Sequence, residues 1–140
     1  MPFLLDTNVV SELRKAPNCH PNVRLWYDAT PLEELYLSVL TLGEMRRGVE
    51  KKRRGDSITA RLYEKWLREV AVVQRERIPT VNAAICDIWG RLSVDPRLPP
   101  IVGLLAATAI HHNLTVATRN EADFQRVGVD YFNPFTGGKP

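Results

Sequence analysis

Short apolar runs alternate along this chain with longer segments in which apolar residues recur at spacings of three and four. The runs at 3–5, 35–39 and 114–117 predict buried strands, and the run at 129–132 offers a fourth. The longer segments predict helices, and a helix between two strands returns the chain to a parallel neighbour by a right-handed crossover. The pattern therefore predicts an α/β fold: a three-layer α/β/α sandwich around a mostly parallel sheet of four to five strands.

Helix boundaries follow from capping residues and from proline and glycine. We expect helices at 9–14, 22–29, 41–55, 56–77, 82–92 and 104–110, with a turn-rich loop at 96–100. Thr41 and Glu44 have the spacing of a capping box, which predicts that Glu44 lies in the first turn of its helix. Asn113 suits the left-handed position that follows a helix C-terminus.

A length of 140 residues is typical of one domain of ordinary size. We expect a single domain at 1–135 and a flexible C-terminal tail at 136–140. No apolar run approaches the roughly 20 residues of a membrane span, and the N-terminus lacks the pattern of a signal peptide. Cys19 and Cys86 are too few for a disulfide scaffold. These features predict a cytoplasmic protein without a membrane partner.

The basic residues concentrate in one block of an otherwise mildly basic chain, whose net charge is +3. Between Arg46 and Arg54, six of nine residues are Lys or Arg. Such a block can attract phosphate groups. It can equally be the solvated end of a helix, where Lys and Arg are favoured. We prefer this second interpretation unless other features point to nucleic acid.

Polar side chains follow the predicted strands at the point where each strand ends. Asp6 follows the first strand, Glu44 follows the second, and Asn120 and Asp123 follow the third. In a parallel sheet these side chains converge on one edge, where ligands of α/β folds bind. Clustered carboxylates repel one another, so they must share a proton or be neutralised by a hard cation such as Mg²⁺ or Mn²⁺.

Each of these residues also has an ordinary structural explanation as a helix cap. Asp6 can cap the first helix, Thr41 and Glu44 can form a capping box, and Asn120 and Asp123 can begin the last short helix. Taken singly, each residue is better explained as a cap. Taken together, the two functions are compatible, because an N-cap at a strand end sits where a metal would bind.

Several ordered motifs give the chain a resemblance to a known family. They are Phe3–Glu12, Ser38–Gly48, Trp89–Leu92, Leu104–Ala109, Leu114–Asn120 and Asn133–Phe135. Together they resemble a VapC-type toxin of the PIN-domain ribonuclease family, over nearly the whole chain. The resemblance implies a PIN-like domain that acts as the toxin of a type II toxin–antitoxin system. It also implies a Mg²⁺- or Mn²⁺-dependent endoribonuclease that cleaves RNA by metal-assisted phosphodiester hydrolysis.

The resemblance assigns roles to the residues at the sheet edge. Asp6 and Glu44 match the first and second acidic positions, and Asp123 matches the last polar cluster, which makes these three the expected catalytic residues and metal ligands. Support from neighbouring polar groups is expected of Asn8, Thr118 and Asn120. The side chains expected to grip the RNA backbone are Arg46, Arg47, Lys51, Lys52, Arg53, Arg54 and Arg119.

One position departs from the family pattern. Where the family carries an aspartate that is a central metal ligand, this chain has Val102, which offers no oxygen. Asp95 lies seven residues earlier, but Pro96, Pro99 and Pro100 stiffen the intervening loop. Either the protein is a weakened or inactive nuclease, or the valine is a change that allows a toxic protein to be produced.

The resemblance also implies that the chain forms a homodimer, or a larger assembly with a VapB-like antitoxin. Contact with operator DNA is expected only through the antitoxin. We expect the antitoxin to dock between the first helices, near Val9, Leu13, Val23, Trp26 and Tyr27. The alternative function is a catalytically inactive PIN-like module that binds the antitoxin in a DNA-bound repressor complex. A phosphoacceptor receiver domain ranks far behind, because it needs paired acids where Asp6 stands alone.

Overall fold

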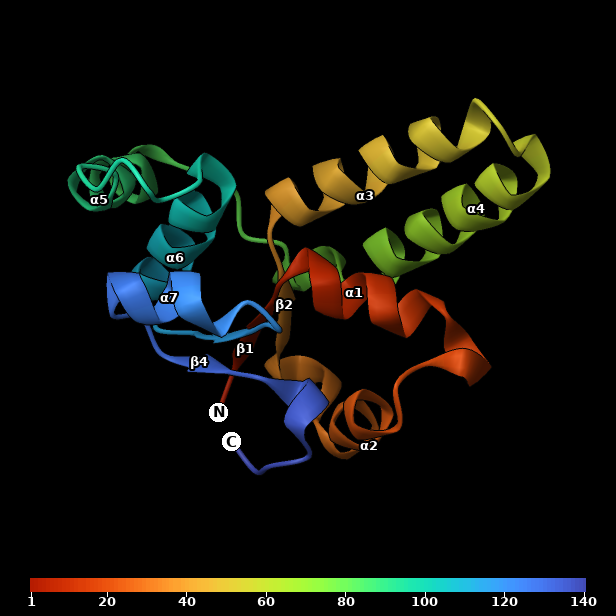
Figure 1. Ribbon diagram of the computed structural model, residues 1–140, viewed down its shortest axis with the longest axis horizontal. Helices are drawn as coiled ribbons and strands as arrows, with labels where there is room; N and C mark the ends of the chain where they lie inside the picture. The colour runs from red at the N-terminus through yellow and green to blue at the C-terminus, as the bar shows by residue number, and fades with distance from the viewer.

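Within the described chain, a parallel sheet of four short strands runs through the middle of the molecule (Figure 1). The computed structural model describes residues 1–140, apart from the side chain of Ala16. The strands are β1 (Phe3–Leu5), β2 (Leu35–Leu37), β3 (Thr115–Ala117) and β4 (Tyr131–Phe132), in the spatial order β2-β1-β3-β4. All neighbouring pairs are parallel, which confirms the predicted sheet.

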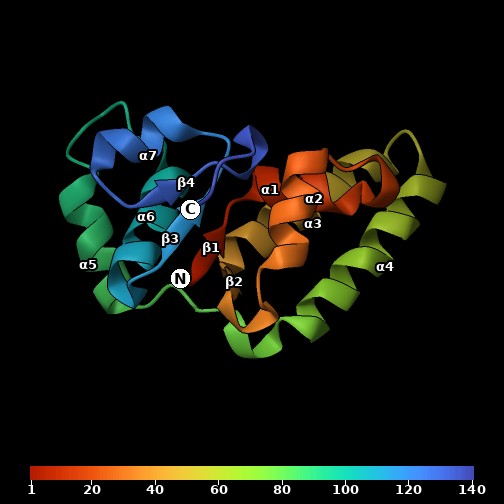
Figure 2. The same cartoon turned by 90° about the horizontal axis from the view of Figure 1, so that it is seen from below.

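Helices cover the two faces of the sheet as separate groups (Figure 2). One side carries α1 (Thr7–Arg14), α2 (Pro21–Ala29), α3 (Val39–Arg53) and α4 (Ser57–Val73). The other carries α5 (Ala83–Leu92), α6 (Pro100–His112) and α7 (Glu121–Val127). Short 3₁₀ turns at Ala16–Asn18, Leu32–Glu34, Arg75–Arg77 and Pro134–Thr136 complete the described elements.

The alternation of side chains along β1 separates two hydrophobic cores. Phe3 and Leu5 pack into the core beneath α1 to α4, whereas Leu4 packs into the core beneath α6 and α7. Successive residues of a strand point to opposite faces, so a strand that is apolar throughout needs cover on both sides. The three-layer α/β/α prediction is thereby confirmed.

The start of α3 differs from the prediction. The hydroxyl of Ser38 accepts a hydrogen bond from the backbone N–H of Leu40 at 3.0 Å, so the helix begins at Val39 and β2 ends at Leu37. Thr41 is fully buried inside the helix. The capping-box prediction is therefore wrong, because the earlier hydroxyl caps the helix first, and Glu44 lies in the second turn instead of the first.

The helix α6 also begins earlier than predicted. Pro100 occupies its first position, where the fixed φ of proline favours a helix start and its missing N–H is not needed. Val102 therefore lies inside the first turn of α6. Asn113 ends this helix in the left-handed conformation (φ 55°), as predicted.

The two termini lie close together in Figure 1. The N-terminal ammonium group pairs with Glu34 at 3.2 Å. No helix among the described residues is both long enough and apolar enough to cross a membrane. The boundary between a domain at 1–135 and a flexible tail at 136–140 stays a prediction.

Candidate active site

The ends of β1 and β3 bring two polar side chains together. The backbone N–H of Asp6 donates to the carbonyl of Ala117 at 2.9 Å, so the residues that follow these strands are neighbours. The hydroxyl of Thr118 then donates to Asp6 Oδ2 at 2.8 Å. The extended backbone of β1 thus delivers Asp6 to the carboxyl edge of the sheet.

Asp6 is both a helix cap and the centre of a hydrogen-bond network. Its Oδ1 accepts from the backbone N–H of Thr7 at 2.8 Å, which makes Asp6 the N-cap of α1. Its Oδ2 also accepts from Asn8 Nδ2 at 3.2 Å. Asn8 in turn accepts the backbone N–H of Arg119 at 3.1 Å, which ties the loop after β3 to α1.

Glu44 reaches the same place from α3. The hydroxyl of Thr7 donates to Glu44 Oε1 at 2.6 Å, so a single threonine connects α1 to the second acidic residue. Asp6 is buried, with 8% of its surface exposed. Burial raises the pKa of the Asp6 carboxyl, and the neighbouring Glu44 carboxylate raises it further, against the lowering effect of the hydrogen bonds. The Asp6 carboxyl therefore favours a proton or a nearby cation.

Asp123 is connected to Asp6 only indirectly, through Asn120 and Thr118. Its carboxylate accepts from Asn120 Nδ2 at 2.9 Å and from Arg126 at 3.1 Å. The backbone N–H of Asn120 donates to the Thr118 hydroxyl at 2.9 Å, which completes a chain of hydrogen bonds from Asp6 to Asp123. Arg126 already supplies Asp123 with a positive charge.

The side chains available as ligands determine whether a divalent ion fits this site. Among the described residues, no three His, Cys, Asp or Glu side chains gather closely enough to hold a metal ion. Asp6 and Glu44 are linked because both accept hydrogen bonds from Thr7, whereas Asp123 pairs with Arg126. Mg²⁺ often takes one or two carboxylates, with water and substrate phosphates as its other ligands. Asp6 and Glu44 fit a hydrated ion of this kind, whereas the predicted three-carboxylate set is not assembled.

The position that departs from the family pattern has no carboxylate to replace it. Val102 packs against the core beneath α6 and α7. Asp95 is held by Arg97, whose Nε and Nη2 donate to its two oxygens at 3.0 and 2.8 Å. This clamp lowers the pKa of Asp95 to about 2. The Asp95 carboxylate is therefore paired with Arg97, and its loop is also stiffened by prolines.

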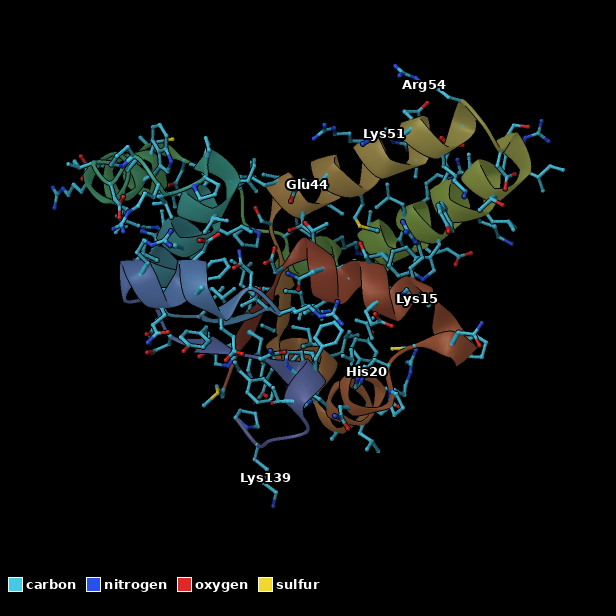
Figure 3. All side chains as sticks on the ribbon, viewed as in Figure 1. Lys15, His20, Glu44, Lys51, Arg54 and Lys139 are labelled. Atoms are coloured by element: carbon cyan, nitrogen blue, oxygen red, sulfur yellow. The ribbon has the colours of Figure 1, made fainter. Side chains whose placement is uncertain are left out.

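The basic block on α3 divides into two groups. Arg46 and Arg53 both pair with Glu50 and Glu64, and these ion pairs tie α3 to α4. The exposed members are Arg47, Lys51, Lys52 and Arg54. Figure 3 shows Glu44, Lys51 and Arg54 in a row along α3. Arg119, in the loop after β3, stacks over the ring of Phe135 at 4.0 Å.

The predicted docking groove needs correction. Val9, Val23 and Trp26 are core residues, with 0%, 0% and 8% of their surfaces exposed. Leu13 and Tyr27 instead line an apolar hollow of about 160 Å³ between α1, α2 and α4, which we call the α4 groove. Its other lining residues are Leu5, Val10, Leu37, Trp66, Glu69, Val70, Val73 and Gln74. Among the described residues, the buried Gln74 Oε1 finds no hydrogen-bond partner.

Sequence reasoning missed two residues that organise the site. Arg126 had a visible signal, because it lies three residues after Asp123 on a helix, where opposite charges meet. The sequence carries no such signal for Thr7, because its hydrogen bond to Glu44 joins residues that lie 37 positions apart.

Comparison with known proteins identifies relatives that match most of the chain. Residues 3–130 match the PIN domain. The chain is 35% identical to Toxin FitB of Neisseria gonorrhoeae over 139 residues, covering 95% of this chain and 98% of the relative. It is 33% identical to VapC ribonuclease Y4jK of Sinorhizobium fredii, covering 95% and 97%.

Solved structures agree with the sequence relatives. A chain of the FitAcB crystal structure from Neisseria gonorrhoeae superposes with a TM-score of 0.84 at 33% identity, covering 95% of this chain and 98% of that chain. DNA-bound VapBC from Salmonella typhimurium shares the fold, with a TM-score of 0.79 at 18% identity, covering 96% and 98%. The chain belongs to the PIN-domain family. The predicted family is confirmed, and the receiver-domain alternative falls away.

Proposed function

We propose that this chain is the toxin of a type II toxin–antitoxin pair and acts in the cytoplasm as a Mg²⁺- or Mn²⁺-dependent endoribonuclease. The observation that carries the proposal is the buried Asp6 beside Glu44 at the carboxyl edge of a PIN-domain sheet. Relatives of the chain named as a toxin and as a VapC ribonuclease support it.

The residues of the edge fix the geometry in which such an ion would be held. Asp6 and Glu44 would hold it, Thr118 and Asn8 restrain Asp6, and Thr7 restrains Glu44. Side chains fixed in this way need little reorganisation when charge develops in the reaction. The chemistry that a divalent ion supplies when bound is activation of water and stabilisation of charge on a phosphate.

Because Val102 offers no oxygen ligand, we propose that this chain binds the metal ion weakly. A carboxylate at this position would sit in the first turn of α6, where the helix dipole favours a negative charge. We expect Val102→Asp to tighten Mn²⁺ binding by about tenfold or more, because ligand charge governs affinity for hard cations. Calorimetric titration with Mn²⁺ and a gel assay of RNA cleavage measure the two effects.

The control is Val102→Asn, which has a similar size without the charge. Cleavage that rises in Val102→Asp and not in Val102→Asn supports the nuclease proposal. If the aspartate variant neither binds Mn²⁺ more tightly nor cuts RNA, the nuclease proposal is wrong.

The alternative function is an inactive PIN-like module that binds an antitoxin and acts in a DNA-bound repressor complex. Val102 favours it, and so does the pairing of Asp123 with Arg126. One neighbouring structure is FitAB bound to a DNA fragment, at 33% identity and a TM-score of 0.83. RNA that is bound but left intact at every Mn²⁺ concentration would support this alternative.

The proposed partner is a VapB-like antitoxin, seated in the α4 groove. An amphipathic segment would bury its apolar side chains there. A backbone N–H of that segment would satisfy Gln74 Oε1, which is buried and without a partner among the described residues. A homodimer, or a larger assembly with the antitoxin, stays a prediction, and so does contact with operator DNA through the antitoxin.

A further inference from the structure

Arg119 joins the loop of the candidate active site to the C-terminal end of the chain. It lies between Thr118 and Asn120 after β3, and its guanidinium carbon stands 4.0 Å from the centre of the Phe135 ring. A cation over an aromatic face at such a distance is attracted by the electrons of the ring. Phe135 is buried, with 9% of its surface exposed, so the arginine stacks on a surface that packing holds in place.

The turn that carries Phe135 is anchored to α2. The backbone N–H of Phe135 donates to Asn133 Oδ1 at 3.0 Å, and its carbonyl accepts from Asn22 Nδ2 at 2.9 Å. Its ring meets the His20 ring edge to face, and the backbone N–H of His20 donates to the buried Glu12 carboxylate at 2.9 Å. Figure 1 shows this final turn beside α2. Phe135 is therefore a fixed point to which a loop can be attached.

A second contact attaches the same turn to the far end of the loop. Asn133 Nδ2 donates to Glu121 Oε2 at 3.1 Å. Glu121 is the first residue of α7 and directly follows Asn120. The C-terminal turn therefore contacts the chain on both sides of Asn120, at Arg119 and at Glu121.

The backbone of Arg119 reaches the acidic edge of the sheet through Asn8. Its N–H donates to Asn8 Oδ1 at 3.1 Å. Because a backbone N–H can only donate, this bond takes the oxygen of the Asn8 amide and leaves the Nδ2 group as a donor. That group donates to Asp6 Oδ2 at 3.2 Å and to the Thr118 hydroxyl at 3.3 Å. The position of the Arg119 backbone thus sets the orientation of a side chain that contacts Asp6.

We propose that Arg119 is a positioning residue that acts on Asp6 through Asn8. Its guanidinium attaches the loop to Phe135, and its backbone N–H keeps the Asn8 amide in the orientation that restrains the Asp6 carboxylate. The inference rests on the proposed function. In place of the RNA contact expected from the sequence, it assigns the guanidinium a contact within the protein.

Hydrogen exchange of backbone amides measures whether Arg119 holds the loop. NMR on the full chain without metal follows the N–H groups of residues 119 and 120, which donate to Asn8 and Thr118. After correction for intrinsic rates, Arg119→Gln should speed their exchange by about two- to fivefold, the range for losing one exposed cation–π contact. The amides of β1 should keep their rates, because the variant loosens the loop and not the whole fold.

The matched control is Arg61→Gln. Arg61 is exposed on α4, so the substitution removes the same charge from a position outside the loop and the C-terminal turn. It should leave the exchange of residues 119 and 120 unchanged.

A second variant removes the other half of the contact. Phe135→Leu keeps an apolar side chain without the aromatic face, and it should speed the same loop amides. The protein with both Arg119→Gln and Phe135→Leu should exchange no faster in the loop than Phe135→Leu alone, because both substitutions break one shared contact.

Two further measurements separate positioning from a phosphate contact. Calorimetric titration with Mn²⁺ should show an affinity about two- to fivefold lower in Arg119→Gln than in the parent or in Arg61→Gln, because Asp6 loses a restraint. Binding of a fluorescein-labelled oligoribonucleotide, measured with Ca²⁺ in place of Mg²⁺, should keep its salt dependence. Loss of a phosphate contact would instead reduce the slope of log affinity against log salt by about 0.7.

The outcomes separate this inference from the proposed function. Unchanged exchange at residues 119 and 120 in Arg119→Gln overturns the inference, and so does a reduced salt slope. Faster exchange with unchanged Mn²⁺ affinity also overturns it, because the loop is then held without effect on Asp6. Equally faster exchange in β1 and in the loop contradicts a local contact. A parent protein that neither binds Mn²⁺ nor cuts RNA contradicts the proposed function, whereas the exchange rates still decide whether Arg119 holds the loop.

Discussion

At the scale of single residues, nearby arginines determine which carboxylates are left without a cationic partner. Asp123 accepts from Arg126 at 3.1 Å, and Asp95 accepts two hydrogen bonds from the guanidinium of Arg97. Asp6 has hydroxyl, amide and backbone donors instead, and burial raises its pKa. A carboxylate that lacks a cation of its own is the one with most to gain from an added ion.

The clamp on Asp95 predicts a measurable titration. Arg97 lowers the pKa of Asp95 from 3.8 to about 2, so NMR should find the midpoint of the Asp95 carboxyl shift near pH 2. Because the folded-state pKa lies below the unfolded value, this group stabilises the fold above about pH 3.8. That contribution is lost as the pH falls toward about 2. In Arg97→Gln the midpoint should rise toward the ordinary value, and an unchanged midpoint would contradict the clamp.

The sequence predicts residues of the site well where strand ends are readable and poorly where side chains meet across the fold. Asp6 and Thr118 follow β1 and β3, and the backbone bond from Asp6 to Ala117 makes them neighbours. Glu44 meets Asp6 through Thr7, a contact that depends on how α3 crosses α1. Asp123 pairs with Arg126 of its own helix, a contact that the pattern of strand ends does not predict.

At the scale of elements, the first residue of a helix depends on which of several nearby side chains caps it. Ser38 and Thr41 both offer a hydroxyl and both are fully buried, but the Ser38 hydroxyl accepts the backbone N–H of Leu40 and is therefore the cap. Pro99 and Pro100 were compatible with a loop, yet Pro100 starts α6. Apolar periodicity therefore predicts that a helix exists, whereas its first residue is determined by local competition.

The packing of α5 against α6 depends on one glycine. A Cβ at Gly103 would lie 3.0 Å from Trp89 Cδ1 and 3.1 Å from Leu98 Cδ2. Gly103→Ala should lower the free energy of unfolding by about 1–3 kcal/mol, because the larger residue overpacks a filled contact. Urea denaturation followed by circular dichroism measures the change.

The control lies in the neighbouring helix. Gly90 of α5 is exposed, and an added Cβ meets nothing within 4 Å. Gly90→Ala should raise the free energy of unfolding by up to about 1 kcal/mol, because alanine favours the helix. If both substitutions stabilise the protein, the contact between Gly103 and Trp89 is not tight.

At the scale of the whole molecule, the alternating pattern predicts the layers because both sheet faces must be covered. It does not predict which surface the layers leave open. Val9, Val23 and Trp26 have the composition of a docking stripe, yet the sheet buries them. One open surface is the α4 groove, which combines Leu13 of α1 with Trp66 of α4, and these residues are far apart in the sequence.

Two adjacent valines at the end of α4 test whether the α4 groove holds the antitoxin. Val73 lines the groove and is 55% exposed, whereas Val72 is 60% exposed and lies outside its lining. Val73→Asp should weaken the complex with a co-expressed VapB-like antitoxin by about tenfold, because it buries an unpaired charge in an apolar contact. Val72→Asp adds the same charge at a similarly exposed position and should leave the dissociation rate unchanged. Surface plasmon resonance on the two purified variants compares the rates, and equal rates would place the antitoxin on another surface of the toxin.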